Sequence, residues 1–79
     1  MRRRVVINSI YKHFKGDLVK VLYIAKNSET LQDMVVYEHK NQVWVRPYDM
    51  FISKIDKEKY PDCNQKYRFE LQDIKSVKD

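Results

Sequence analysis

Trp44, Arg46 and Tyr48 are the side chains of this sequence that offer the clearest binding chemistry. Trp44 and Arg46 stand two residues apart in an apolar run that predicts a strand, so their side chains project from the same face. Tyr48 follows Pro47, which is well placed at the first position of a helical turn. An exposed aromatic ring beside a guanidinium can stack on a nucleobase or hold a proline-rich peptide. The alternative is structural, with Trp44 in the core and Arg46 paired to a carboxylate.

Two further sets of side chains are candidates for ligand contact. His13, Lys15 and Tyr11 alternate along a predicted strand, so the three side chains share one face and could contact an anion together. His13 could equally be a packed residue whose ring nitrogens bond to the backbone. Ser28 and Glu29 lie in a long polar loop. This loop is predicted either to reach over the site as a recognition loop or to cap its own turn through local hydrogen bonds.

The residue types that enzymes need are poorly represented. General acid–base catalysis would need His13 or His39 beside a nucleophile or a carboxylate, and the sequence offers no such pair. Cys63 has no neighbouring base to activate it. The spacing of the cysteine and histidines does not suit a metal ion, and the single glycine excludes glycine-rich phosphate loops. We therefore predict that the protein is not an enzyme and has no catalytic residue, metal ion or cofactor.

Short apolar runs separated by polar breaks predict an all-β domain, because Val, Ile, Tyr and Phe favour strands. The runs fall at 5–14, 18–25, 34–39, 43–46, 52–55 and 67–71, with a helical turn at 47–51. This order favours a small SH3-like barrel of about five antiparallel strands, with the short helical turn before the last barrel strand. The alternative is an open antiparallel sheet, completed by the C-terminal strand or by a partner subunit.

The barrel is predicted over residues 10–72, between a basic N-terminal segment at 1–9 and a C-terminal tail at 73–79. Five apolar side chains in the predicted elements are expected to form the core: Val21, Val36, Val45, Phe51 and Ile55. Seventy-nine residues bury little surface, so a homodimer is a reasonable source of additional stability.

The charge distribution indicates what the domain binds. The net charge of +5 is concentrated in the first 26 residues, where seven Lys and Arg accompany a single Asp. Such asymmetry can steer anionic partners, although a basic face can also be merely solvated and aid solubility. The steering interpretation favours nucleic acid or a nucleotide as the ligand of a non-catalytic binding module. The alternative is a protein-interaction module that docks a protein partner or peptide. A lone cysteine and the lack of a long apolar stretch predict a soluble, cytoplasmic protein with no membrane contact.

Four short motifs occur along the chain: Tyr11-Lys12-His13-Phe14-Lys15-Gly16, Ser28-Glu29-Thr30, Val35-Val36-Tyr37, and Trp44-Val45-Arg46-Pro47 followed by Met50-Phe51. Together they resemble domain-of-unknown-function family 1653, whose members are short bacterial and phage proteins grouped with SH3-like folds. The resemblance runs from about Tyr11 to Phe69 and implies this fold and a bacterial or phage origin, but no activity. Two features depart from the family pattern. Glu38 stands where relatives usually carry arginine, and the hairpin at 40–42 is shorter and lacks glycine.

Overall fold

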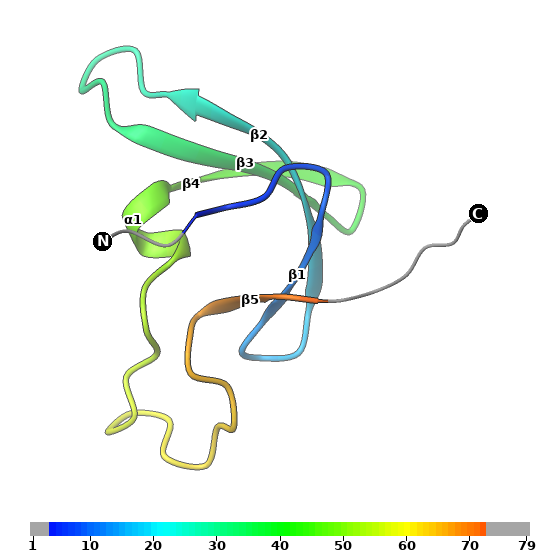
Figure 1. Cartoon of the computed structure of the whole chain (residues 1–79), viewed down its shortest axis with the longest axis vertical. Coiled ribbons are helices and arrows are strands. Elements are labelled where there is room, and N and C mark those ends of the chain that lie inside the picture. Colours follow the sequence, from blue (N-terminus) through cyan, green and yellow to red (C-terminus); the bar gives the residue numbers. More distant parts are fainter. Residues whose placement is uncertain (1–3, 73–79) are drawn as a thin grey trace.

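The computed structural model describes residues 4–72, which form an antiparallel sheet and one short helix (Figure 1). The elements of this part of the chain are β1 (Ile10–His13), β2 (Leu18–Lys26), β3 (Asp33–His39), β4 (Gln42–Pro47), α1 (Tyr48–Phe51) and β5 (Phe69–Leu71). The all-β class is confirmed. Arg2, Arg3 and the predicted tail at 73–79 lie outside the described residues.

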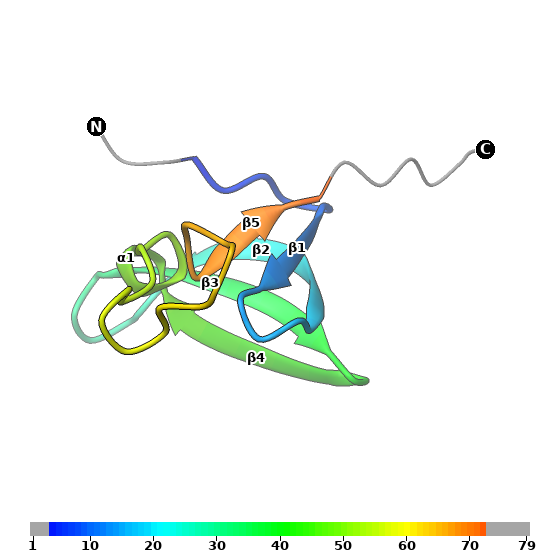
Figure 2. The same ribbon diagram turned by 90° about the horizontal axis from the view of Figure 1, so that it is seen from below.

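The five strands form one sheet in the order β4-β3-β2-β1-β5, and each neighbouring pair is antiparallel. The sheet bends so strongly that β1 and β5 lie across from β3 and β4, with the core between them (Figure 2). A register shift between Val21 and Tyr23 in β2 marks an irregularity of the kind that bends a strand.

The predicted closed barrel is wrong, because β4 and β5 are the two edges of the sheet within residues 4–72 and do not pair. Pro47 ends β4 and has no amide hydrogen to extend a ladder, and the chain turns directly into α1. β5, on the other edge, has only three residues. The architecture is therefore an open, strongly bent five-stranded sheet.

Tight turns connect β1 to β2 and β3 to β4. Gly16, with φ of 105°, closes the turn between β1 and β2, a backbone conformation that glycine adopts without a side-chain penalty. Lys40 and Asn41 form the two-residue loop between β3 and β4, with φ values of 54° and 64°. Two consecutive residues at positive φ match the right-handed twist of the flanking strands, so this hairpin is compact without glycine.

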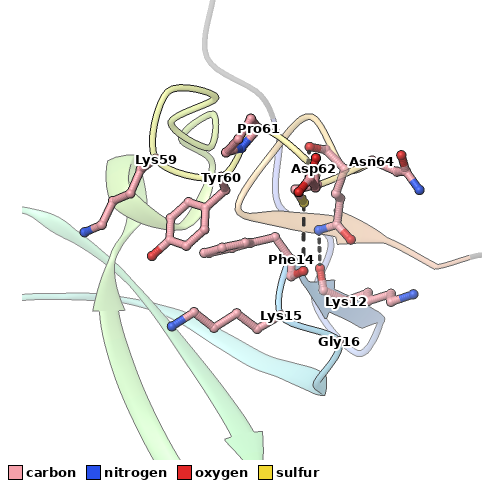
Figure 3. A pocket seen from close by; sticks show the side chains of 11 residues that line it. Lys12, Phe14, Lys15, Gly16, Lys59, Tyr60, Pro61, Asp62 and Asn64 are labelled. Carbon is pink, nitrogen blue, oxygen red and sulfur yellow. Dashed lines mark hydrogen bonds between the residues drawn. The ribbon is translucent and has the colours of Figure 1, made fainter.

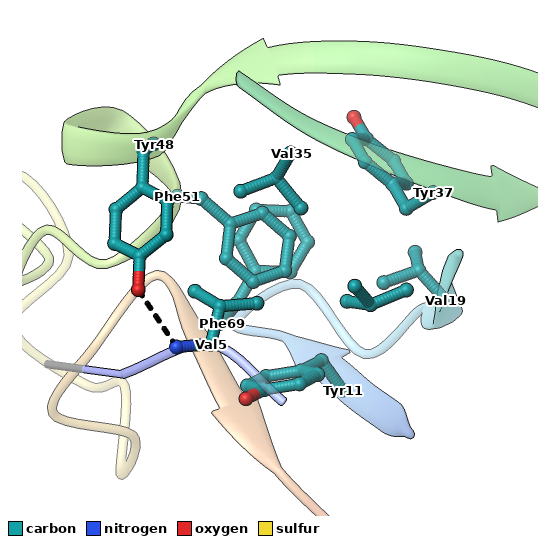
Figure 4. Packing of buried hydrophobic residues seen from close by; sticks show 9 residues of the cluster. Val5, Tyr11, Val19, Val35, Tyr37, Tyr48, Phe51 and Phe69 are labelled. Atoms are coloured by element: carbon teal, nitrogen blue, oxygen red, sulfur yellow. Dashed lines mark hydrogen bonds between the residues drawn. The ribbon is translucent and has the colours of Figure 1, made fainter. Parts of the chain in front are cut away.

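The core is built around aromatic rings (Figure 4). Phe51 of α1 and Phe69 of β5 stack face to face, with ring centroids 4.1 Å apart and planes 4° apart. Tyr11 meets Phe51 edge to face at 5.3 Å. The predicted core positions Val21, Phe51 and Ile55 are confirmed as buried.

Two of the predicted core positions and one predicted strand are wrong. Val45 is 58% exposed, because β4 is an edge strand and Val45 projects from the opposite face to Arg46. Val36 is only half-buried. Residues 52–55 do not form a strand, and their ladder is reduced to one isolated bridge between Lys54 and Tyr67.

The segment before β1 packs against the core and bonds to β2 and α1. Val5 is buried in the core, and the N–H groups of Val5 and Val6 donate to the hydroxyl oxygens of Tyr48 and Tyr11, at 2.8 and 2.9 Å. The N–H of Asn8 also donates to the carbonyl oxygen of Val21. Among the described residues, no helix has the length and apolar character needed to cross a membrane.

Candidate functional site

A cavity of about 160 Å³ lies on the concave side of the sheet, and we call it the inner cavity. Its lining comes from all five strands and from the turn between β1 and β2: His13, Asp17, Val19, Tyr37, His39, Arg46 and Phe69. Two residues predicted to contact a ligand, His13 and Arg46, therefore meet in one cavity, although 33 positions separate them in the sequence.

Arg46 reaches into the inner cavity from β4. Its guanidinium carbon lies 5.4 Å from the centroid of the Phe69 ring. Its Nε atom is buried and has no hydrogen-bond partner among the described residues. A buried N–H without an acceptor is unfavourable, and the penalty is greater for a charged group. The side chain thus presents an unused donor next to the cavity.

His13 is held as a neutral donor on the opposite wall. The backbone N–H of Lys15 donates to Nδ1 of His13 at 3.1 Å, so the neutral ring carries its proton on Nε2. Burial, followed by the positive charges of Arg46 and Arg68, lowers the pKa of His13 below its usual value. The ring also packs edge to face against Phe69, with centroids 4.9 Å apart.

His39, at the end of β3, contacts Asp17, which lies in the turn between β1 and β2. Both residues line the inner cavity. Nε2 of His39 lies 3.7 Å from Oδ1 of Asp17, and this contact becomes an ion pair when the imidazole is protonated. Tyr37, two residues before His39 on β3, is buried in the same wall. Asp17, Tyr37 and His39 were not predicted from the sequence as residues of this site. Alternation along β3 could have linked Tyr37 to His39, but only the bend of the sheet brings Asp17 to them.

The remaining predicted site residues are not gathered at the inner cavity. Trp44 lies on the same strand face as Arg46 and is 50% exposed. Lys15 lines a different cleft. Ser28 and Glu29 are exposed in the loop between β2 and β3, at the opposite end of β3 from His39 (Figure 1).

The loop that holds Ser28 and Glu29 is organised by local hydrogen bonds. Oδ1 of Asn27 accepts from the backbone N–H groups of Glu29 and Thr30, at 2.9 and 3.2 Å. This is the turn-capping role that short polar side chains commonly have. The loop does not line either cavity described here.

Tyr48, which was predicted to be exposed for ligand contact, is buried at 7% of its accessible surface. Its ring enters the core because α1 turns inward, and its hydroxyl meets the backbone of Val5 (Figure 4). Tyr48 therefore connects the N-terminal segment to the core, and it does not line the inner cavity with His13 and Arg46.

Replacing Tyr48 by phenylalanine tests this assignment. We expect the substitution to lower the free energy of unfolding by about 1–3 kcal/mol, because the buried N–H of Val5 loses its acceptor. Urea denaturation would measure the change. Tyr23→Phe is the matched control, since Tyr23 is 67% exposed and should lose almost nothing. Equal stability of Tyr48→Phe and the parent protein would contradict the role given to this hydroxyl.

A second and larger concavity, of about 570 Å³, lies between the β1–β2 turn and the loop at 56–66, and we call it the outer cleft (Figure 3). Its lining is Lys12, Phe14, Lys15, Gly16, Lys59, Tyr60, Pro61, Asp62, Cys63, Asn64 and Gln65. Cys63 is partly buried there, with Sγ 3.9 Å from the carbonyl oxygen of Phe14. Within residues 4–72, no group of three or more His, Cys, Asp or Glu side chains could hold a metal ion.

The inner cavity brings the Arg46 guanidinium together with the His13 imidazole and the Asp17 carboxylate. Arg46 supplies a positive charge and an unused N–H, and His13 supplies an Nε2–H donor. The apolar walls of Val19 and Phe69 strengthen such hydrogen bonds by limiting the access of water.

Comparison with known proteins gives one match. A family model described as "Protein of unknown function (DUF1653)" matches residues 9–71, a range that contains the lining of both the inner cavity and the outer cleft. No curated protein and no solved structure matches the chain.

Proposed function

Because the chain belongs to the DUF1653 family, whose description assigns no function, we propose a function from its own site. The domain is a non-catalytic binding module for an anionic ligand, a nucleotide or nucleic acid. The inner cavity takes a phosphate group of this ligand.

The observation that carries the proposal is the buried Nε of Arg46, which has no hydrogen-bond partner among the described residues. An arginine can give two parallel N–H bonds to the oxygens of a phosphate, and such charge-assisted bonds are stronger than neutral ones. A phosphate in the inner cavity would neutralise the guanidinium, and a turn of the side chain toward the cavity would let the buried donor bond to it. The Phe69 ring beneath the guanidinium keeps the donors in place before the ligand arrives.

The volume of the inner cavity limits what enters it. Small-molecule sites commonly measure about 300–1,000 Å³, so a cavity of about 160 Å³ accommodates one anionic group and not a whole nucleotide. The rest of the ligand must lie outside. Trp44, half-exposed on the same strand face as Arg46, offers a ring on which a base can stack.

The strand order supports assignment to the SH3-like class, although the sheet is open. The meander from β1 to β4 returns through α1 to β5, and β5 pairs with β1. This is the order of elements on which the SH3-like prediction was based.

Titration with fluorescent single-stranded oligonucleotides and with mononucleotides, at low salt, tests the function. We expect Arg46→Ala to weaken binding by roughly 10- to 100-fold, the value of a hydrogen-bonded charge. Arg46→Lys should not restore affinity, because lysine keeps the charge but loses the paired N–H geometry. Deleting Arg2 and Arg3 should weaken binding less, since a preorganised guanidinium beside an aromatic ring contributes more than a charge that acts at long range.

Lys20→Ala is the matched control for charge. Lys20 is exposed and lies between the buried residues Val19 and Val21, so its side chain projects from the convex side of the sheet. Its removal should change the affinity by less than twofold. Equal losses from Arg46→Ala and Lys20→Ala would show that binding depends on net charge alone and would contradict a role for the inner cavity.

A second candidate function is favoured by the β4 edge. Val43, Trp44 and Val45 are 54%, 50% and 58% exposed on an edge strand, where unpaired backbone groups can accept a strand from another chain. A protein partner or a second copy of this chain could bind there. Failure to bind any nucleotide or oligonucleotide, together with self-association that Val45→Lys abolishes in sedimentation experiments, would favour this function.

A further inference from the structure

We propose that the outer cleft is a nucleotide subsite, and that the ligand is single-stranded nucleic acid running between the outer cleft and the inner cavity. This inference rests on the proposed function and specifies its substrate class. The outer cleft, at about 570 Å³, has the size that the inner cavity lacks for a base and its sugar.

Two aromatic rings form the wall of the outer cleft. Phe14 and Tyr60 come from segments 46 positions apart, and their ring centroids lie 4.7 Å apart with planes at 61°. Both side chains are half-buried, and Figure 3 shows them pointing toward one another. An edge-to-face pair leaves a ring face that does not contact the other ring. A nucleobase can stack on such a face without regard to sequence.

Three lysines without an acidic partner among residues 4–72 flank these rings. Lys12, Lys15 and Lys59 line the cleft, and none of them forms an ion pair within the described part of the chain. The ammonium groups of Lys15 and Lys59 lie 5.9 and 5.8 Å from the Phe14 and Tyr60 ring centroids, respectively. The acidic side chain in the lining is that of Asp62. Charge and stacking surface therefore occur together, as in sites that follow the backbone of a single strand.

The outer cleft is held in shape by hydrogen bonds that do not use the side chains of these three lysines. Nε2 of Gln65 donates to the carbonyl oxygens of Lys12 and Tyr67, at 2.8 and 3.0 Å, and so ties the loop to β1. Nζ of Lys57 donates to the carbonyl oxygens of Cys63 and Gln65, at 2.6 and 3.3 Å. Lys57 therefore stabilises the loop, while the lysines of the lining remain available to phosphates.

The two concavities share a wall. His13 lines the inner cavity and Phe14 lines the outer cleft, and the centroids of these consecutive rings lie 4.5 Å apart. Arg68 lies next to this wall, with its guanidinium carbon 5.9 Å from the Phe14 ring centroid. A strand of a few nucleotides can cross this wall, with a base against Tyr60 and a phosphate at Arg46. A mononucleotide can occupy only one of the two sites.

Thymidine oligonucleotides of one, two, four and eight nucleotides provide the test. We expect affinity to increase at least tenfold from thymidine monophosphate to the four-residue oligonucleotide and then to level off. The log–log salt dependence should steepen by about 0.7 for each phosphate that is contacted. Tyr60→Ala should weaken binding of the longer oligonucleotides about tenfold, whereas Tyr60→Phe should preserve it, because stacking needs the ring and not the hydroxyl.

A triple variant examines the lysines. Replacing Lys12, Lys15 and Lys59 by alanine should lower the salt slope for the four-residue oligonucleotide by about two, at roughly 0.7 per lost contact. The matched control replaces Lys20, Lys26 and Lys54, which are exposed and line neither concavity. Melting temperatures of all variants establish that each is folded.

The outcomes separate this inference from the proposed function. If every oligonucleotide binds no more tightly than thymidine monophosphate while Arg46→Ala weakens all of them, the outer cleft is not a subsite and the inner cavity retains its role. Equal losses in the two triple variants would also overturn the inference. If Arg46→Ala changes no affinity, the proposed function itself fails.

Discussion

Replacing Phe51 by alanine is expected to cost about 3–5 kcal/mol of unfolding free energy, the usual loss when a buried phenylalanine is truncated. Phe51 is 1% exposed and stacks on Phe69 at 4.1 Å. Its ring also meets Tyr11 and Tyr37, with centroids at 5.3 and 5.9 Å. A domain of 79 residues has a total stability near the low end of about 5–15 kcal/mol. The substitution should therefore leave much of the protein unfolded at 37 °C.

Thermal and urea denaturation followed by circular dichroism would measure this loss. Met50→Ala is the matched control, because Met50 is the preceding residue of α1 and is 47% exposed. Its loss should stay within about 0.5 kcal/mol, as for most surface changes. A Phe51→Ala variant that melts within a degree of the parent would show that the aromatic stack does not hold α1 on the sheet.

Local sequence patterns predicted most strands correctly but not the way in which the sheet ends. The apolar runs around Val21 and Phe51 correctly predicted that these two side chains are buried. Val45 shows the limit of this approach, because the same apolar run occurs in a central strand and in an edge strand. Whether β4 would meet β5 depended on Pro47 and on the shortness of β5. The pairing of two edge strands depends on how all five strands are arranged, and not on the residues of one strand alone.

The sequence predicted only those residues of the candidate site that the pattern of their own strand indicates. His13 and Arg46 were selected from their own strands, and the structure places both in the inner cavity. Asp17 and His39 join them because the sheet bends and brings two turns together, which no local period reveals. The burial of Tyr48 was not predicted, because it depends on a contact with Val5, a residue 43 positions earlier.

The outer cleft was missed for a similar reason. Residues 56–66 fall between the runs at 52–55 and 67–71, and nothing near Tyr60 in the sequence indicates that its ring meets Phe14. The contact depends on Gln65, whose side chain bonds to the backbone of Lys12 across 53 positions. Polar side chains that bond to a distant backbone have no periodic signature, so a loop of this kind is recognised only from coordinates.

Phe69 joins the core to the inner cavity, and its substitutions should separate stability from binding. One face of its ring stacks on Phe51, and the ring also contacts His13 and the Arg46 guanidinium. Phe69→Ala should cost about 3–5 kcal/mol of stability, as for Phe51. Phe69→Leu keeps most of the apolar volume and should cost less than about 1.5 kcal/mol.

Phe69→Leu should nevertheless weaken ligand binding by roughly 2- to 30-fold, because a guanidinium over an aromatic face gains about 0.5–2 kcal/mol that leucine cannot supply. Titration with the four-residue thymidine oligonucleotide, below the melting temperature, would measure the change. Val21→Ala is the matched control, since Val21 is fully buried but does not line the inner cavity. It should lower stability and leave affinity intact. If both variants bind as the parent does, the Phe69 ring supports the fold alone, and Arg46 does not need it to hold an anion.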